Sequence, residues 1–343
     1  MEILLPSRIV DRHVGGNTTY GRCLERELLA RGVGVGRIPS AGNAPLTALK
    51  ETLAGVRRGI PGQVVHYLAD TGPLLPTRRP AVVTVHGVAS RWEQGIRTPR
   101  QERIWRTRVG AAIRNTSDII TVSESSADDI AEIFSVDRSR IHVILHGMDP
   151  AKPPKPTDLV DQLNSKFPRG YVSYVGNLEP RKNLVALIEA FDSPMLRDMG
   201  IPLVIAGKPA WNAESTMSAI QAAKNVEYVG FVSEEEKTGL IAGACLFVFP
   251  SLYEGFGFPV LEALAQGTPV LCSERGALSE VAGPSKMFVD LDSGSIAKSI
   301  ADALGDSEFL TECAIEGPRW ASKFTWSDSA ERHVAVYEKA LAR

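Results

Sequence analysis

The sequence of 343 residues lacks long apolar runs and has only four cysteines. Its longest apolar stretches, such as residues 245–250, are far too short to span a bilayer, so we expect no membrane-spanning helix. The cysteines are scattered, which favours buried thiols in a reducing compartment over a disulfide framework or a zinc site. The first residues contain no basic segment ahead of an apolar one, so we expect no signal peptide and a cytoplasmic location.

The sequence also lacks a Gly-x-Gly-x-x-Gly motif that opens a helix, which disfavours a nicotinamide oxidoreductase. Charge is unevenly spread, because residues 1–150 carry a net +5 and the remainder a net −7 within the total of −2. Such an asymmetry bears on partners and not on fold. No nucleic-acid-binding motif accompanies the basic half, so we expect no nucleic-acid partner.

The densest basic segment is residues 91–114, with seven Arg against two Glu. Trp92, Ile96, Ile104 and Trp105 are interleaved with these charges. One interpretation is a solvated helix with buried aromatic side chains. The other is a surface for an anionic acceptor, or a peripheral contact with the inner face of the membrane.

Short β-branched runs alternate with helical patterns, which predicts an α/β fold with parallel sheets covered on both faces. The chain length predicts two domains. Four prolines lie close together between Pro150 and Pro156, where they disfavour both helix and central strand. We therefore predict an N-terminal Rossmann-like domain at 1–150, a Pro-rich linker at 151–168 and a second Rossmann-like domain at 169–324. The predicted strands are residues 2–5, 33–38, 63–68, 81–85, 118–122, 141–145, 171–175, 202–206, 226–229, 245–250, 269–273 and 286–289.

The first segment that indicates chemistry follows a predicted strand that ends at Gly176. We expect the next helix to begin near Arg181, with Arg181 and Lys182 exposed at its N-terminus. Free backbone N–H groups, the helix dipole and two side-chain cations would together favour an anion at this sheet edge. Without an anion, two cations in a first helical turn are locally unfavourable. The segment therefore predicts an anion-binding site.

The second segment is a Gly-rich loop between another strand and a helix expected at 259–266. Gly255 and Gly257 would let the backbone approach a ligand closely. Glu254 and Glu262 lie eight positions apart and can face the same anion site. Carboxylates accept hydrogen bonds from vicinal hydroxyl groups, so the ligand would carry phosphates and several hydroxyls. For Glu262 alone, a partnership with the helix dipole is the alternative interpretation.

Together these segments resemble the retaining glycosyltransferases of family 4, whose GT-B fold has two Rossmann-like domains with parallel sheets facing across a cleft. The resemblance implies that Arg181 and Lys182 neutralise the diphosphate of a nucleotide-sugar donor. It also implies that Glu254 holds the transferred sugar, acting in catalysis with the two cations, and that Glu262 holds the ribose. The loop residues expected to bind the donor are Gly176, Gly255, Phe256, Gly257 and Phe258.

Other segments extend the resemblance along the second half. The loop 230–233, with Phe231 and Val232, is similar to the nucleobase-binding turn of the family. Residues 206–211 are similar to the Gly-Lys-x-x-Trp stretch of hexosyltransferases that build bacterial surface polysaccharides, which favours GDP-mannose as donor. The helix 325–343 is expected to return to the N-terminal domain, as it does in relatives.

In the N-terminal half, Gly15 and Gly16 are similar to the loop whose backbone touches the donor phosphate. His86 ends a strand where the family places a histidine near the reacting sugar, although Gly87 follows it instead of the usual Asp. His146 stands where relatives often carry Asn. We expect the remaining histidines to be structural.

The resemblance implies retaining transfer of a hexose, with mannose favoured, to a hydroxyl of a saccharide or lipid-linked acceptor. No metal and no cofactor are expected, because Arg181 and Lys182 can offset the diphosphate charge. Asp290 and Asp292 form an Asp-x-Asp that binds Mg²⁺ in another glycosyltransferase fold, but Asp292 is expected to begin a helix here. The alternatives are a GT-B nucleotide-sugar epimerase, a sugar phosphorylase and a non-catalytic sugar-nucleotide-binding protein.

Overall fold

The computed structural model describes residues 1–11, 15–91 and 98–343, and the chain divides into two compact units. The first unit comprises Met1–Gly147 and Phe324–Arg343, and the second comprises Met148–Lys323. Each unit holds one six-stranded parallel sheet. All of the strands predicted from β-branched runs are present, so the predicted α/β class is confirmed.

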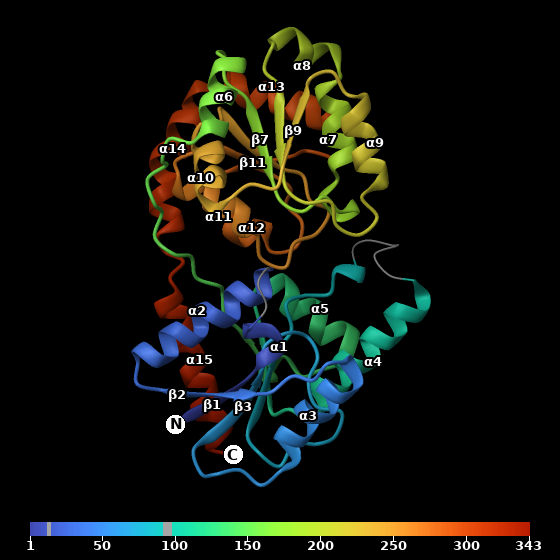
Figure 1. Ribbon diagram of the computed structural model, residues 1–343, viewed down its shortest axis with the longest axis vertical. Coiled ribbons are helices and arrows are strands. Elements are labelled where there is room, and N and C mark those ends of the chain that lie inside the picture. Colours follow the sequence, from blue (N-terminus) through green and yellow to red (C-terminus); the bar gives the residue numbers. More distant parts are fainter. Residues whose placement is uncertain (12–14, 92–97) are drawn as a thin grey trace. The chain divides into compact units, whose positions relative to one another are not determined.

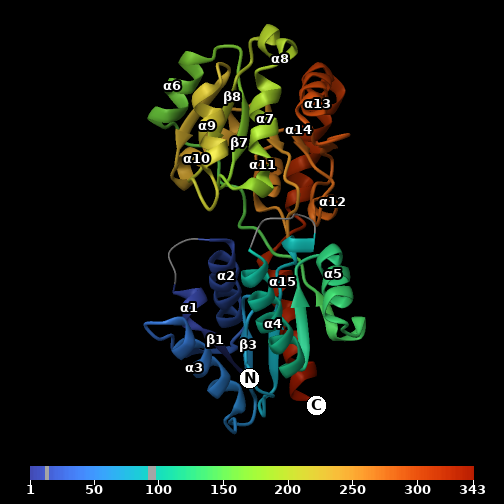
Figure 2. The ribbon, with the colours of Figure 1, turned by 90° about the vertical axis from the view of Figure 1, so that its right-hand side faces the viewer.

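The sheet of the first unit has the strand order β2-β1-β3-β4-β5-β6. Its strands are β1 (Glu2–Pro6), β2 (Gly34–Ile38), β3 (Gln63–Tyr67), β4 (Ala81–Thr84), β5 (Asp118–Thr121) and β6 (Ile141–Val143). Its helices are α1 (Ser7–Val10), α2 (Gly16–Ala30), α3 (Ala44–Val56), α4 (Pro99–Asn115), α5 (Glu124–Phe134) and α15 (Trp326–Leu341). Helices α2 and α15 pack side by side (Figure 1, Figure 2).

Alternate residues of β3 serve different parts of the core of the first unit. Val65 and Tyr67 belong to the buried apolar cluster that includes Val109 of α4 and Ile130 of α5. His66 is instead hydrogen-bonded to Tyr337 of α15. Because successive strand residues point to opposite faces, this pattern places α4 and α5 on one face and α15 on the other.

The sheet of the second unit has the strand order β12-β11-β10-β7-β8-β9. Its strands are β7 (Val172–Val175), β8 (Leu203–Ala206), β9 (Val226–Gly230), β10 (Leu246–Phe249), β11 (Val270–Cys272) and β12 (Lys286–Met287). Its helices are α6 (Asp158–Lys166), α7 (Leu184–Phe191), α8 (Pro194–Met199), α9 (Glu214–Ala222), α10 (Glu234–Ala242), α11 (Phe258–Ala265), α12 (Leu278–Val281), α13 (Ser293–Gly305) and α14 (Ser307–Ala321). Figure 1 shows α7 and α9 on one side of this sheet and α10, α11 and α14 on the other.

The predicted linker 151–168 is wrong in its second half. Thr157 caps α6 by accepting a hydrogen bond from the backbone N–H of Val160, and Leu163 is buried. This helix packs against α10 and belongs to the second unit. The prolines restrict only the residues ahead of Thr157, and beyond them an ordinary N-cap starts a helix.

Across the described ranges, no helix combines the length and the apolar character that a membrane crossing requires. The longest helix of the structure, α4, is strongly basic.

Candidate functional site

The second unit brings its chemistry-bearing residues to the point where the strand order reverses. The chain runs from β7 outward to β8 and β9, then returns to β10 and runs outward the other way to β11 and β12. The loops that follow β7 and β10 therefore leave the sheet as neighbours at its carboxyl edge. In open α/β sheets this switch point is where ligands bind. Arg181 and Lys182 follow β7, and Glu254 follows β10.

The sequence predicted that Arg181 and Lys182 lie in the first turn of an α-helix. This prediction is wrong. They belong to a 3₁₀ turn, Pro180–Lys182, and Asn183 then adopts the left-handed conformation (φ 57°) before α7 begins at Leu184. The side chain of Asn183 donates to the carbonyl of Leu291 at 2.8 Å, which holds this turn in place. The two cations are thus presented by a bend ahead of the helix.

Lys182 is buried, which corrects the expectation that both cations are exposed. Only 5% of the residue is accessible, its ammonium donates to Glu254, and Nζ lies 4.6 Å from the centre of the Phe249 ring. Burial lowers the pKa of Lys182 although the neighbouring carboxylate opposes that shift. Arg181 is the more accessible cation, with 22% of its side chain exposed.

Glu254 joins the two cations into one network. Its Oε2 atom lies 2.9 Å from Nη1 of Arg181, and its other oxygen accepts from Lys182. Burial alone would raise the pKa of Glu254, but the charges of Lys182 and Arg181 outweigh it and hold the pKa at about 2. The sequence correctly predicted that these three residues meet. It did not predict that both cations pair directly with the one carboxylate of Glu254.

Two further residues of this network were not predicted as site residues. The carboxylate of Glu179 receives Nε and Nη2 of Arg181 at 3.1 and 3.2 Å, and Nε1 of Trp211 at 2.9 Å. Glu179 precedes Arg181 by two positions, so its acidic charge beside two cations was the available signal. The sequence pointed to Trp211 only as the last residue of the Gly-Lys-x-x-Trp stretch at 206–211.

Glu262 is not bonded to these residues. It lies on α11, and its Oε1 atom accepts from Nζ of Lys237 of α10 at 2.8 Å. Burial raises the pKa of Glu262, and the Lys237 ammonium opposes that rise. About 30% of the Glu262 side chain remains exposed, so its carboxylate can still reach a ligand.

Two glycines of the site are required by geometry. Gly257 has φ 113°, and a Cβ atom there would lie 2.7 Å from a methyl group of Leu278. A Cβ atom on Gly207 would lie 1.8 Å from the carbonyl oxygen of Gly176, so the loops that follow β7 and β8 touch backbone to backbone. Gly255 is not among the glycines with a positive φ. In the same Gly-rich loop, Phe256 and Phe258 pack edge to face at 5.0 Å.

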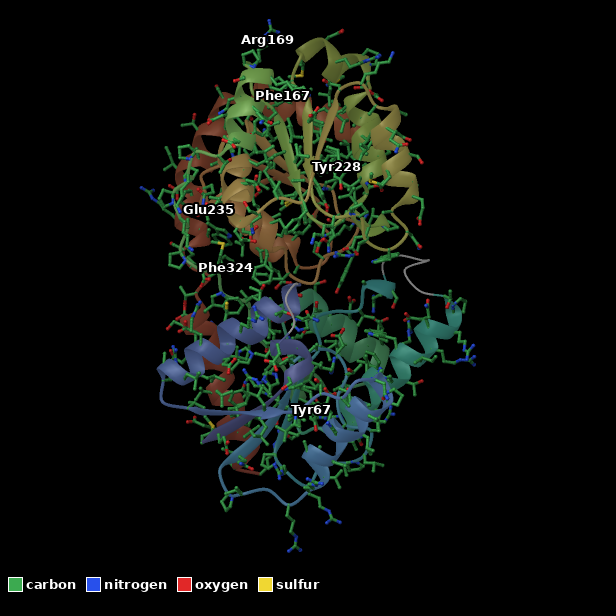
Figure 3. All side chains as sticks on the ribbon, viewed as in Figure 1. Tyr67, Phe167, Arg169, Tyr228, Glu235 and Phe324 are labelled. Carbon is green, nitrogen blue, oxygen red and sulfur yellow. The ribbon has the colours of Figure 1, made fainter. Side chains whose placement is uncertain are left out.

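The loop after β9 exposes an aromatic side chain at the same carboxyl edge. Phe231 is 63% exposed, with Nζ of Lys208 3.9 Å from the centre of its ring, and Val232 beside it is half-buried. Tyr228, labelled in Figure 3, lies on β9 and donates to the carbonyl of Gly207 at 2.9 Å. An exposed ring braced by a cation is a suitable platform for stacking.

The first unit carries its own group of predicted residues at its carboxyl edge. Gly15 has φ 121° and stands at the N-cap of α2. Apart from the adjoining residues, no atom of the described chain lies within 4 Å of a Cβ placed on Gly15 or Gly16. His86 follows β4, and its Nε2 atom donates to the carbonyl of Leu68 at 2.8 Å. In the neutral ring this leaves Nδ1 as an acceptor. The backbone N–H of His86 donates to Asp70, which has φ 50°.

Behind His86 lies a buried hydrogen-bonded network of histidines, a tyrosine and a threonine. His333 Nδ1 donates to the carbonyl of Ser329, so its Nε2 accepts from the hydroxyl of Tyr20 at 2.8 Å. Tyr20 in turn accepts from Thr84, and Thr84 accepts from Nε2 of His66 at 2.7 Å. Burial lowers the pKa of each of these histidines. The structural role predicted for both histidines is consistent with these contacts.

His146 is also buried in this region. Its ring lies 4.8 Å from that of Tyr20 and 5.5 Å from that of His86. Burial lowers its pKa well below the usual value. A neutral aromatic ring therefore stands where an Asn is usual among the relatives that the sequence resembles.

The remaining predicted sites have simple outcomes. Asp292 caps α13 by accepting from the backbone N–H of Ser295 at 3.0 Å, which is the structural role predicted for it. Asp290 is exposed and accepts from the N–H of Leu291. Trp92 and Ile96 of the basic segment lie outside the described residues. Trp105 of α4 packs against Phe134 of α5.

Two family models match the chain. One described as "Glycosyl transferases group 1" matches residues 157–320, and one described as "Glycosyltransferase Family 4" matches residues 15–152. The matches thus fall on the two structural units in turn, and together they cover most of the sequence.

Curated relatives and solved structures agree with these matches. The chain is 31% identical over 229 residues to O-antigen chain mannosyltransferase B of Escherichia coli, covering 64% of this chain and 60% of that protein. It is also 31% identical over 236 residues to MMP alpha-(1->4)-mannosyltransferase of Mycolicibacterium hassiacum, covering 67% and 56%. The chain therefore spans less than two thirds of the length of these relatives. The structure of Anabaena HepE in complex with UDP and glucose shares the fold, with a TM-score of 0.73 at 16% identity over 99% of this chain and 100% of that one.

Proposed function

Because this chain belongs to the GT-B glycosyltransferases, we propose that it transfers a hexose from a nucleotide-diphosphate sugar to a hydroxyl of a saccharide or lipid-linked acceptor, with retention. The observation that carries the proposal is the network of Arg181, Lys182 and Glu254 at the switch point of the second sheet. It combines an anion-binding cation with a carboxylate that can accept sugar hydroxyls.

The proposed reaction breaks the bond between the anomeric carbon and a diphosphate oxygen and forms one to the acceptor oxygen. The acceptor proton passes to the departing diphosphate. Negative charge grows on the leaving oxygens, where a preorganised donor such as Arg181 contributes roughly 3–4 kcal/mol to lowering the barrier. Glu254, whose pKa is held at about 2, stays ionised at neutral pH and can only accept hydrogen bonds. It therefore suits a role in gripping hydroxyls and not in protonating the leaving group.

Around this centre, we expect several loops of the second unit to contact different parts of the donor. Glu262 would accept the ribose hydroxyls, and Phe231 with Val232 would meet the base at the far end of the strand order. The Gly-rich loop at 255–258 would approach the sugar. In the first unit, we expect the backbone N–H groups at the N-terminus of α2, near Gly15 and Gly16, and Nδ1 of His86 to contribute contacts to the donor.

Mannose is the favoured sugar because two relatives at 31% identity are named as mannosyltransferases. The test is to measure donor consumption and thermal stabilisation with GDP-mannose, UDP-glucose, UDP-GlcNAc and dTDP-rhamnose. We expect GDP-mannose to give the largest shift and to release GDP. If nucleotide is released only from one of the other three donors, the sugar of that donor takes the place of mannose in the proposal. If none of the four donors binds, the proposal that the chain is a transferase is wrong.

Metal independence is a separate part of the proposal. The network already supplies cations, and Asp292 is engaged in capping α13. We therefore expect nucleotide release to continue at an unchanged rate in EDTA. A strict requirement for added Mg²⁺ would contradict this part and leave the transferase proposal standing.

The basic helix α4 supports a peripheral membrane contact as part of the same proposal. Arg100, Arg103 and Ile104 are exposed on it, and 51% of Ile104 is accessible. Cations beside an exposed apolar side chain suit an anionic headgroup surface. The test is sedimentation of the protein with phosphatidylglycerol vesicles. Binding to these vesicles should be lost in the double variant Arg100→Glu with Arg103→Glu. The wild type should not bind vesicles of phosphatidylcholine alone.

A further inference from the structure

We propose that Glu179 and Trp211 form a positioning pair that fixes the direction of the Arg181 guanidinium. The pair would act through Arg181 and would not touch the donor itself. This inference rests on the proposed function, because it assigns Arg181 to the donor diphosphate.

The salt bridge between Glu179 and Arg181 has two points of contact. Glu179 is 8% exposed, and its two oxygens receive two different nitrogens of Arg181, Nε at 3.1 Å and Nη2 at 3.2 Å. A two-point contact of this kind fixes the plane of the guanidinium as well as its position. Trp211 then donates to Oε2 of Glu179 at 2.9 Å, so the carboxylate cannot turn freely.

The contacts of Arg181 leave few of its N–H donors for a ligand. A guanidinium has five N–H groups. Two of them meet Glu179, and Nη1 meets both the carbonyl of Tyr253 at 3.0 Å and Glu254 at 2.9 Å. Within the described residues this leaves one N–H, on Nη2, for an incoming oxygen. The side chain of Arg181 is 22% exposed and is therefore not fully enclosed. Arg181 is thus a cation with a set direction.

Backbone hydrogen bonds also hold the loops of Glu179 and Trp211 together. Leu178 donates to the carbonyl of Lys208 at 2.9 Å, and Ala210 donates to the carbonyl of Leu178 at 3.0 Å. The loop that carries Glu179 and the loop that carries Trp211 are therefore joined by two backbone hydrogen bonds at Leu178, the residue before Glu179. Side chains held on joined backbones lose little further freedom when they bond, which is the condition for orienting a reacting group.

A simpler interpretation of Glu179 predicts the opposite result. If the carboxylate only offset the charge of Arg181, its removal would strengthen the attraction for a diphosphate. If it positions Arg181, its removal lets the guanidinium turn and slows the reaction. Trp211→Phe separates the two effects, because it removes the N–H donor without changing any charge.

The experiment measures kcat and KM for release of GDP from GDP-mannose, or of UDP from UDP-glucose if the wild type uses that donor. Glu179→Gln should lower kcat roughly 10- to 100-fold, and Trp211→Phe about tenfold, with KM changed far less. The matched control is Trp320→Phe. That indole also donates to one acceptor at 2.9 Å, the carbonyl of Val281 in the same unit, and the variant should retain wild-type kcat.

A second measurement shows whether the pair acts through Arg181. In an Arg181→Lys background the two-point contact cannot form, so Glu179→Gln and Trp211→Phe should each change kcat less than twofold. Equal fold-losses in both backgrounds would overturn the proposal, as would an increase in kcat on Glu179→Gln. If the wild type binds neither GDP nor UDP in calorimetry, the proposed function falls together with the inference. If it binds and turns over while the variants match it, only the inference falls.

Discussion

The two units place polar side chains at the carboxyl edges of similar sheets, but they satisfy them in different ways. The first unit uses neutral groups, with His66, Thr84, Tyr20 and His333 in a single directed chain of hydrogen bonds. The second unit uses charges, with Glu179 and Glu254 alternating with two cations. A neutral chain fixes ring orientations without attracting ions, whereas a charged network can exchange a carboxylate for a phosphate oxygen. We therefore expect the neutral chain to support the residues around it and the charged network to contact the ligand itself.

The largest effect is expected from a variant that removes one cation from the charged network of the second unit. Lys182→Met removes the ammonium from the buried carboxylate of Glu254, and we expect a loss of about 3 kcal/mol in the free energy of unfolding. The measurement is urea unfolding at pH 7.5. The control is Lys237→Met, which breaks the more exposed pair with Glu262 and should cost less than about 1 kcal/mol. Equal losses in the two variants would contradict the burial assigned to Lys182.

The next effect tests the neutral side through pH. Burial lowers the pKa of His333 to about 4, although its hydrogen bond to Ser329 opposes that shift. As pH falls below about 6.5, the unfolded chain takes up a proton that the folded chain refuses, so stability is lost between pH 6.5 and 4. From pH 7.5 to 5 this amounts to about 2 kcal/mol from His333 alone.

The variant for this test is His333→Gln, whose side-chain oxygen can still accept from Tyr20 without titrating. We expect it to be less stable at pH 7.5 but to lose less stability on going to pH 5 than the wild type does. Parallel stability curves for the two proteins between pH 7.5 and 5 would show that His333 is not held neutral by the fold.

The smallest effect on the fold sharpens the functional side. Glu262→Gln removes a charge that is 30% exposed and pairs only with Lys237 among the contacts of the described chain, so stability should change by less than about 1 kcal/mol. Nucleotide binding should weaken roughly tenfold, because a diol loses a charged acceptor. Calorimetry with GDP measures the affinity. Unchanged affinity would leave Glu262 as a partner of Lys237 alone.

The sequence predicted the fold well because its signals are local. Short apolar runs, most of them with β-branched residues, mark the strands. The spacing of four apolar residues likewise indicates the buried face of α7, namely Leu184, Leu187, Ile188 and Phe191. The predicted linker is too long because a proline restricts the backbone conformation only of itself and its immediate neighbours. The start of α7 was misplaced because Asn183 takes a left-handed conformation that the pattern of apolar residues does not reveal.

The candidate site was predicted in part for a similar reason. Arg181, Lys182 and Glu254 could be paired because each follows a strand and parallel strands end at one edge. The burial of Lys182 and the contact from Trp211 to Glu179 depend on how two loops pack, and spacing along the chain carries no information about that. The neutral network escaped prediction because a buried His or Tyr looks the same in sequence whether it supports a site or fills a core.

The contact between Gly207 and the carbonyl of Gly176 has one more consequence. Even an alanine at position 207 would push the turn that carries Arg181 away from the neighbouring loop. Tyr228 secures the same spot from the third strand along, through its bond to the Gly207 carbonyl. The loops that follow β7 and β8 and the strand β9 thus meet at one point, close in sequence to the turn that carries Arg181.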